Sequence, residues 1–113
     1  MTLIECTQVT KHYYRGSEQI TPLKQLDLGI DRGSFVALMG PSGSGKTTLL
    51  NLLAGIDTVS EGELIIDNEQ IHRLSKNKLA SWRANHIGYI FQLYNLVPVL
   101  TAYENVEIPL LLH

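Results

Sequence analysis

The stretch Gly40-Pro41-Ser42-Gly43-Ser44-Gly45-Lys46-Thr47-Thr48 decides the fold. It satisfies every position of the phosphate-binding P-loop pattern, G-x-x-x-x-G-K-[ST]. Its three glycines allow a tight turn whose successive backbone N–H groups point inward, because no Cβ hinders a positive φ. Such a concave run of N–H donors forms a nest for an anion. Residues 40–48 therefore predict a site that holds the phosphates of a nucleotide.

Two side chains of the loop have roles that follow from their chemistry. Lys46 places a mobile positive charge near the β- and γ-phosphates, and Thr47 offers a hydroxyl to Mg²⁺. A helix that begins at this point adds its partially positive N-terminus to the same place. The sequence therefore predicts a nucleotide that is bound together with Mg²⁺.

The residues on either side of the loop are those that a P-loop requires. Residues 34–39, Ser-Phe-Val-Ala-Leu-Met, form a continuous apolar run, which predicts a short buried parallel strand. Residues 48–54 favour a helix, and Gly55 is placed to end it. This order of strand, glycine loop and helix distinguishes a functional P-loop from an accidental glycine-rich turn.

Composition narrows the class of protein. The 113 residues make one domain or part of one, and the hydrophobic share of 44% suits a globular core. A net charge of −2 implies no general affinity for nucleic acid. Cys6 is the only cysteine, which excludes an internal disulfide and fits a reducing compartment. No apolar run approaches the ~18 residues of a membrane span, so we expect any relation to a membrane to go through a partner.

Other parts of the chain predict further strands and helices. Strands are expected at residues 3–9, 22–30, 63–66 and 87–91, with a turn at 13–17. Ser75 is expected to cap a helix that reaches about Asn85, and Thr101-Ala102-Tyr103-Glu104 is a capping box that begins another. Cys6 is expected to pack as a small apolar residue in the first strand. The pattern indicates an α/β core with an added β-rich piece.

Charged residues and one apolar stretch need an interpretation of their own. Acidic residues gather between 57 and 69 and basic residues between 72 and 86, which is typical of solvated surface. Leu64-Ile65-Ile66-Asp67 has the form of a strand that ends in an Mg²⁺-binding aspartate. It comes directly after the P-loop helix and a turn, and no second carboxylate follows Asp67 directly. We therefore interpret it as a surface strand with an acidic turn.

Several stretches resemble the ATP-binding subunits of ABC transporters. Residues 9–13 are similar to the family's aromatic loop, residues 35–51 to its P-loop and helix, and residues 87–92 to the strand that enters its Q-loop. Residues 93–98 and 100–110 are similar to the macrolide-export and lipoprotein-release subgroup. The resemblance covers essentially all of residues 1–113. It implies an α/β fold, a P-loop NTPase core with an N-terminal antiparallel β subdomain.

The resemblance also implies roles for individual residues. Tyr13 would stack on adenine, with the neighbouring Tyr14 as the alternative. Gln92 would reach Mg²⁺ or the attacking water, which makes it a catalytic residue with Lys46 and a metal-binding residue with Thr47. The nucleotide-binding cradle would consist of Gly40, Ser42, Gly43, Ser44, Gly45, Lys46, Thr47 and Thr48.

Parts of the family pattern are missing from these 113 residues. They contain no Leu-Ser-Gly-Gly-Gln signature and no second apolar strand that ends in Asp-Glu. The resemblance therefore implies the N-terminal part of an ABC-type domain, incomplete because the C-terminal half is absent. In the family, the neighbours of the P-loop strand come largely from that half. We expect the chain alone to bind ATP and Mg²⁺ without hydrolysing ATP, since hydrolysis needs a carboxylate that orients water.

The complete subunit would couple ATP hydrolysis to transport through a separate membrane-spanning subunit, on the cytoplasmic face of the cell membrane. The resemblance places docking of that subunit near Tyr94, Leu96 and Pro98, although packing in a core is the alternative. A second ATP-binding subunit would complete a nucleotide-sandwich dimer. Three other functions stay open: a nucleotide-binding fragment without activity, a non-transport ABC ATPase of the cell-division type, and a small-molecule kinase, which the scattered arginines disfavour.

Overall fold

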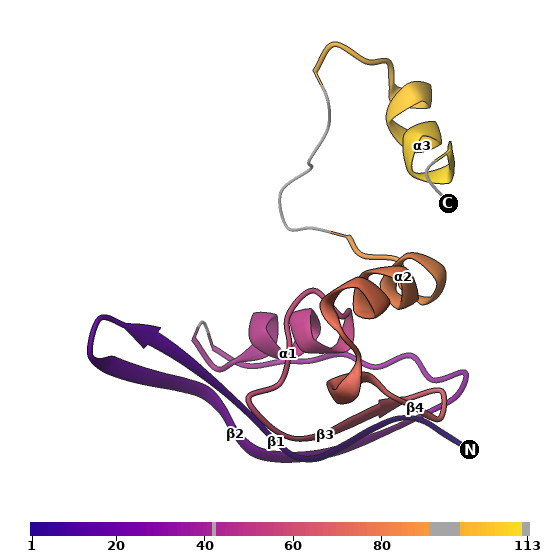
Figure 1. The fold of residues 1–113 in the computed structure, drawn as a ribbon. Helices are drawn as coiled ribbons and strands as arrows, with labels where there is room; N and C mark the ends of the chain where they lie inside the picture. The colour runs from indigo at the N-terminus through magenta and orange to yellow at the C-terminus, as the bar shows by residue number, and fades with distance from the viewer. Residues whose placement is uncertain (42, 91–97, 112–113) are drawn as a thin grey trace.

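A four-stranded antiparallel sheet forms the base of the molecule in the computed structural model, which describes residues 1–41, 43–90 and 98–111 (Figure 1). The strand order is β2-β1-β3-β4. The long hairpin β1 (Thr2–Arg15) and β2 (Glu18–Asp31) is joined by the β3 strand (Glu61–Ile66) and the two-residue β4 strand (Glu69–Gln70). The antiparallel subdomain implied by the family resemblance is therefore present.

The hairpin extends further than the sequence predicts. β1 continues through Tyr13, which pairs with Ile20, and ends at Arg15, so the turn expected over residues 13–17 shrinks to two residues. Gly16, with a φ of 63°, occupies the first turn position. A two-residue turn with a positive φ matches the twist of paired strands. From Tyr13 to the turn the two strands pair without a register shift.

A bulge in β1 is closed by side chains from its neighbours. Gln8 has a φ of 52°, and its backbone N–H donates to Asp27 Oδ1 at 2.8 Å. Its side-chain amide donates to Asp27 Oδ2 at 3.1 Å. Gly62 lies opposite with a φ of 94°, and a Cβ there would come within 2.3 Å of the Gln8 carbonyl oxygen. Only glycine allows β3 to approach the bulge this closely.

The helices α2 and α3 begin where their capping residues predict, and α1 begins two residues before the range expected for it. α1 (Lys46–Leu53) follows the P-loop, and Gly55 ends it with a φ of 73°. Ser75 caps α2 (Lys76–His86) by accepting the Lys78 N–H at 3.3 Å. Thr101 and Glu104 form the reciprocal bonds of a capping box, at 3.1 and 2.9 Å, before α3 (Ala102–Leu111). A single 3₁₀ turn, η1 (Ile71–Arg73), precedes α2.

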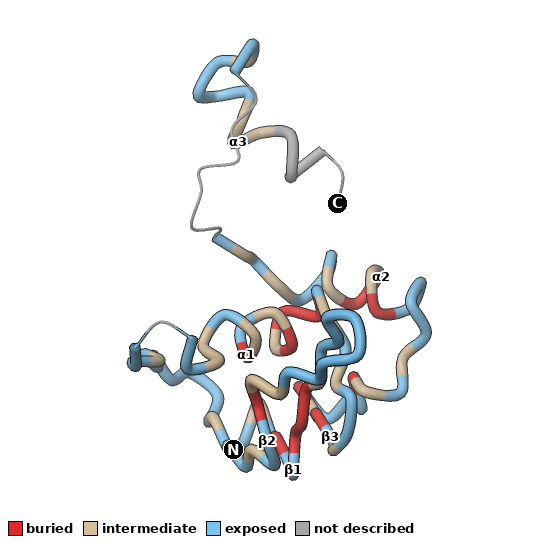
Figure 2. Tube along the Cα trace, turned by 90° about the vertical axis from the view of Figure 1, so that its left-hand side faces the viewer, coloured by how far each residue is buried: buried red, intermediate tan, exposed pale blue. Residues whose placement is uncertain are grey.

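Helices α1 and α2 cover one face of the sheet, and the core lies between the helices and the sheet (Figures 1 and 2). Leu52 and Leu64 are almost fully buried, and Cys6 is buried in β1 as expected. The buried cluster consists of Cys6, Val9, Leu23, Leu49, Leu52, Leu64, Ile66, Ile71, Leu79 and Trp82. The described side chains of α3, those of residues 102–107, are exposed or half-buried. No helix within the described residues is long and apolar enough to cross a membrane.

Two predicted strands do not form. Residues 34–39 have no regular structure, and Phe35 and Met39 are fully or almost fully exposed. Residues 87–90 are likewise irregular, with Ile90 exposed, and Phe91 lies outside the described residues. Within the described residues neither run has a strand beside it in the sheet. A parallel strand needs hydrogen-bonded neighbours, and an apolar run without them has no place to be buried.

Candidate nucleotide-binding site

The P-loop turns through two left-handed glycines. Gly43 has a φ of 84° and Gly45 a φ of 92°. The Ser44 N–H donates to the Pro41 carbonyl at 3.2 Å, and the Leu49 N–H donates to the Gly45 carbonyl at 2.9 Å. Gly45 is therefore the N-cap of α1, and the loop leads straight into the helix N-terminus. This is the geometry that favours an anion, because unpaired N–H groups of the first turn and the helix dipole point to one place.

A close approach to backbone requires glycine at position 45, whereas Gly40 approaches only a side chain. A Cβ at Gly45 would lie 2.7 Å from the Pro22 carbonyl oxygen and 3.0 Å from Leu23 Cδ2, both in β2. A Cβ at Gly40 would lie 2.9 Å from Ser44 Oγ. The first contact is with backbone and sets the loop against the hairpin, whereas the second is with a side chain that can rotate away.

Lys46 lies across the loop in this structure. Its ammonium group donates to the carbonyl oxygen of Gly40, the first residue of the motif. Thr47 is exposed and Thr48 is half-buried in the first turn of α1. A cation, hydroxyl groups and backbone N–H donors are thus gathered at one helix end. This donor set fits the charge and the acceptor oxygens of a phosphate group.

Several residues with predicted roles lie outside the described residues. They are Ser42 in the cradle, Gln92 as catalytic and metal-binding residue, and Tyr94 and Leu96 in the docking segment. Pro98, the third docking residue, lies in an exposed turn. The described part of the site therefore comprises the loop without Ser42, together with the side chains that approach it from β1.

Tyr13 stands on β1 with its hydroxyl fixed to the rest of the molecule. Its hydroxyl donates to Asp57 Oδ2 at 2.6 Å, and a hydrogen bond also links it to the Thr48 side chain. Burial, and then the bond to Asp57 and its negative charge, raise the pKa of Tyr13 to about 12. The residue as a whole remains 38% exposed. Tyr14 is the next residue of the strand and so faces away, with 71% exposure.

Asp57 is the site residue that sequence reasoning missed. It was placed in the solvated acidic stretch, yet its carboxylate pairs with Lys11 at 3.0 Å as well as with Tyr13. Burial alone would raise the pKa of Asp57, but hydrogen bonds from Tyr13, Lys11 and the Thr58 N–H outweigh it and lower that pKa. A lysine at 11, two residues before Tyr13 on the same strand face, is the signal that predicts a nearby carboxylate.

Asp67 lies in the exposed turn after β3, so the acidic turn expected here is present. The strand before it is not a surface strand, because Leu64 and Ile66 belong to the buried cluster. The Asp67 backbone is left-handed, with a φ of 51°, and its carboxylate forms an ion pair with Arg32. The strand pairs antiparallel with β1 and β4. The Asp67 carboxylate thus forms a surface ion pair within the sheet subdomain.

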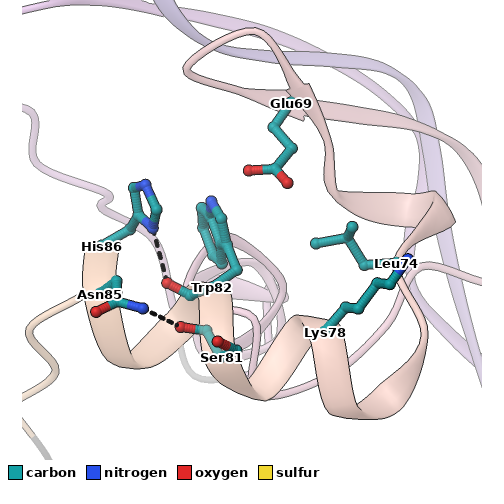
Figure 3. A pocket seen from close by; sticks show the side chains of 7 residues that line it. All are labelled: Glu69, Leu74, Lys78, Ser81, Trp82, Asn85 and His86. Carbon is teal, nitrogen blue, oxygen red and sulfur yellow. Dashed lines mark hydrogen bonds between the residues drawn. The ribbon is translucent and has the colours of Figure 1, made fainter. Parts of the chain in front are cut away.

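A hollow of about 300 Å³ lies between β4 and α2 (Figure 3). The Trp82 ring is stacked on His86, with 5.2 Å between the ring centroids. Its other contacts include Gly55, where an added Cβ would meet the ring at 3.2 Å. Trp82 and Arg83 pack α2 against the end of α1, since Arg83 also donates to the Gly55 carbonyl at 2.8 Å. The hollow is lined by no P-loop residue and lies on the side of Trp82 and His86 that faces Glu69.

Comparison with known proteins places this geometry in a family. The sequence pattern of the ABC transporter family matches residues 23–110. MJ0796 of Methanocaldococcus jannaschii, described as an uncharacterized ABC transporter ATP-binding protein, is 48% identical over 109 residues, which are 96% of this chain and 46% of that protein. The lipoprotein-releasing system ATP-binding protein LolD of Idiomarina loihiensis is 40% identical over 107 residues, 95% of this chain and 47% of that protein.

A solved structure shows the same fold. The dimeric MJ0796 cassette in a post-hydrolysis state, bound to ADP and Pi, superimposes with a TM-score of 0.91 at 46% identity. The match covers 97% of this chain and 47% of that one. The chain thus spans a little under half the length of these relatives. The incomplete P-loop NTPase fold expected from the sequence is confirmed, and the chain belongs to the ABC transporter family.

Proposed function

We propose that this chain is the nucleotide-binding part of an ABC transporter ATP-binding subunit and holds Mg²⁺ and ATP at the P-loop. The observation that carries the proposal is the loop geometry: left-handed Gly43 and Gly45 at the start of α1, with Lys46 lying across the loop. Gly40, Ser42 and Ser44 complete the cradle, Thr47 binds the metal ion, and Thr48 lies toward the α-phosphate. Tyr13 stacks on the base.

The test is equilibrium binding of Mg-ATP to the chain and to Lys46→Ala. We expect the variant to lose affinity by ~30-fold or more, because truncating one partner of a charge-assisted pair costs roughly 2–5 kcal/mol. Lys76→Ala, which removes an exposed lysine at the start of α2, is the matched control and should bind as the parent does. Equal affinity of all three proteins would overturn the proposal.

Within the complete subunit, Gln92 acts with Lys46 in catalysis and with Thr47 in metal binding. This chain alone holds ATP without hydrolysing it. Asp67, the acidic residue that follows a strand, is paired with Arg32 at a surface turn and has no part in this chemistry. We expect phosphate release at the background rate. Turnover that Asp67→Asn abolished would contradict this assignment.

The complete subunit works on the cytoplasmic face of the cell membrane and couples ATP hydrolysis to transport. Two sources support the partners. MacB of Pasteurella multocida, a macrolide export ATP-binding/permease protein, is 47% identical over 107 residues, 95% of this chain and 16% of that protein. The MJ0796 cassette is dimeric. We propose that a membrane-spanning subunit docks near Tyr94, Leu96 and Pro98, as the family resemblance implies, and that a second ATP-binding subunit completes the sandwich. Cross-linking from Pro98→Cys to a co-expressed membrane subunit tests the docking segment.

A further inference from the structure

Three side chains from two distant parts of the sequence meet beside the P-loop helix. Lys11 and Tyr13 are two residues apart on β1 and share one face of the sheet. Asp57 comes from the segment that follows α1. Each oxygen of its carboxylate has a partner: Oδ1 accepts from Lys11 Nζ at 3.0 Å, and Oδ2 accepts from the Tyr13 hydroxyl at 2.6 Å.

Contacts of Asp57 other than the one with Tyr13 fix the position of its carboxylate. Its backbone N–H donates to the Asn51 carbonyl of α1 at 3.2 Å, and Oδ1 also accepts the Thr58 N–H at 2.8 Å. The Lys11 ammonium bonds the Thr58 carbonyl at 2.6 Å, and the Lys11 side chain is only 10% exposed. A buried ammonium with two fixed acceptors does not move freely, so the carboxylate that it pairs with has a defined place.

The Tyr13 ring takes its position from these contacts. Its hydroxyl is tied to Asp57 and to Thr48, and Thr48 belongs to the first turn of α1, next to the phosphate cradle. The Lys11 ammonium lies 5.1 Å from the ring centroid, over one face. One face and the hydroxyl end are therefore engaged, while the residue as a whole stays 38% exposed, which leaves room for a flat ligand group.

We infer that Asp57 is a positioning residue for the nucleobase, which fixes the Tyr13 ring at a set distance from the phosphate cradle. The inference rests on the proposed function, in which Tyr13 stacks on the base. A stacking platform that is fixed before the ligand arrives loses less conformational freedom on binding than a free side chain does. Asp57 thus acts on the base and leaves the contacts to the phosphates unchanged.

The experiment compares two probes, Mg-ATP and magnesium tripolyphosphate, which carries the phosphates without a base. Asp57→Asn has one acceptor oxygen in place of two, so it cannot serve both donors. Tyr13→Phe removes the hydroxyl and leaves the Lys11–Asp57 pair in place. We expect each variant to lower the affinity for Mg-ATP by about 5- to 10-fold, which is part of the free energy of a base-stacking contact. The affinity for tripolyphosphate should change less than twofold. The double variant should bind as Tyr13→Phe does.

Further variants separate the failure of this inference from that of the proposed function. Glu63→Gln, an exposed acid on β3, is the matched control and should change neither probe. Equal losses of both probes in Asp57→Asn would mean that Asp57 supports the fold alone, and would overturn the inference. So would additive losses in the double variant. If Tyr13→Ala left the ratio of the Mg-ATP and tripolyphosphate affinities unchanged, base stacking by Tyr13 would be overturned, and phosphate binding at the P-loop would not be affected. Lys46→Ala with both probes still bound would overturn the proposed function itself.

Discussion

Residues 22–30 and residues 34–39 lie close together in the chain, and only the first stretch is a strand. The second has the more continuous apolar run, Ser-Phe-Val-Ala-Leu-Met. Yet Leu23, in the first, is 8% exposed, whereas Phe35, in the second, is fully exposed. The difference is the neighbour: β2 pairs with β1 along its length, and residues 34–39 pair with no strand among the described residues. Apolar character therefore predicts burial only where a partner strand supplies the hydrogen bonds.

The largest expected contrast is between a core leucine and the unpaired run. Leu52→Ala, at 1% exposure in α1, should lower the free energy of unfolding by roughly 2–5 kcal/mol, because it leaves a cavity. Phe35→Ala should change it by less than ~0.5 kcal/mol, because an exposed side chain loses no packing. Urea unfolding followed by circular dichroism measures both. Equal destabilisation would show that residues 34–39 are packed in solution.

The same contrast explains how much of the fold the sequence predicts. Local signals were sufficient for α2 and α3, whose capping residues Ser75 and Thr101 bond as expected. The P-loop and its helix also follow from local chemistry. The strands expected at residues 34–39 and 87–91 depend on pairing that no local pattern contains. β1 beyond Val9 was missed for the opposite reason, since the partner strand β2 extends it.

The candidate site divides in the same way. The cradle around Gly43, Gly45 and Lys46 could be predicted because the motif is contiguous and each residue has its own chemical reason. Asp57 could not be predicted, because its partners lie 46 and 44 residues away in the sequence. Contacts between residues so far apart in the sequence depend on how the hairpin packs against α1. The acidic composition of residues 57–69 suggests solvated surface and gives no sign of the pairing of Asp57.

A smaller effect is expected where β3 approaches the bulge of β1. Gly62→Ala should lower the free energy of unfolding by roughly 1–3 kcal/mol, because φ is 94° and the new Cβ would overlap the Gln8 carbonyl. Gly29→Ala in β2 is the matched control, since it has ordinary φ and open space for a Cβ. It should cost less than ~0.5 kcal/mol. A neutral Gly62→Ala would mean that β3 is not tightly paired in solution.

The bulge also depends on a side chain. Asp27→Ala removes the acceptor of both Gln8 donors and should lower the free energy of unfolding by about 1 kcal/mol. Asp31→Ala, an exposed acid at the end of the same strand, serves as the control. Thermal unfolding of the two variants provides the comparison. Equal values would show that water replaces Asp27 at the bulge without cost.

The smallest effect tests whether the paired hairpin holds Tyr13 as the structure shows. The pKa of Tyr13 is raised from 10 to about 12, so between these values the folded chain keeps a proton that the unfolded chain has released. This contribution to stability is fully present below pH 10 and is lost as the pH rises through 12. Asp57, with a lowered pKa, contributes stability that is lost as the pH falls below its ordinary value of 3.8. Between about pH 9 and pH 11, Tyr13→Phe should therefore lose less stability than the parent, as urea unfolding would measure.

A second variant tests the cause of the shift. Asp57→Asn should bring the midpoint of the rise in tyrosinate absorbance of Tyr13 nearer to pH 10 without reaching it, because burial persists when the charge is gone. If Tyr13 of the parent protein ionised near pH 10, its hydroxyl would be free in solution. The end of the hairpin would then lack a tertiary contact, as residues 34–39 lack a neighbouring strand.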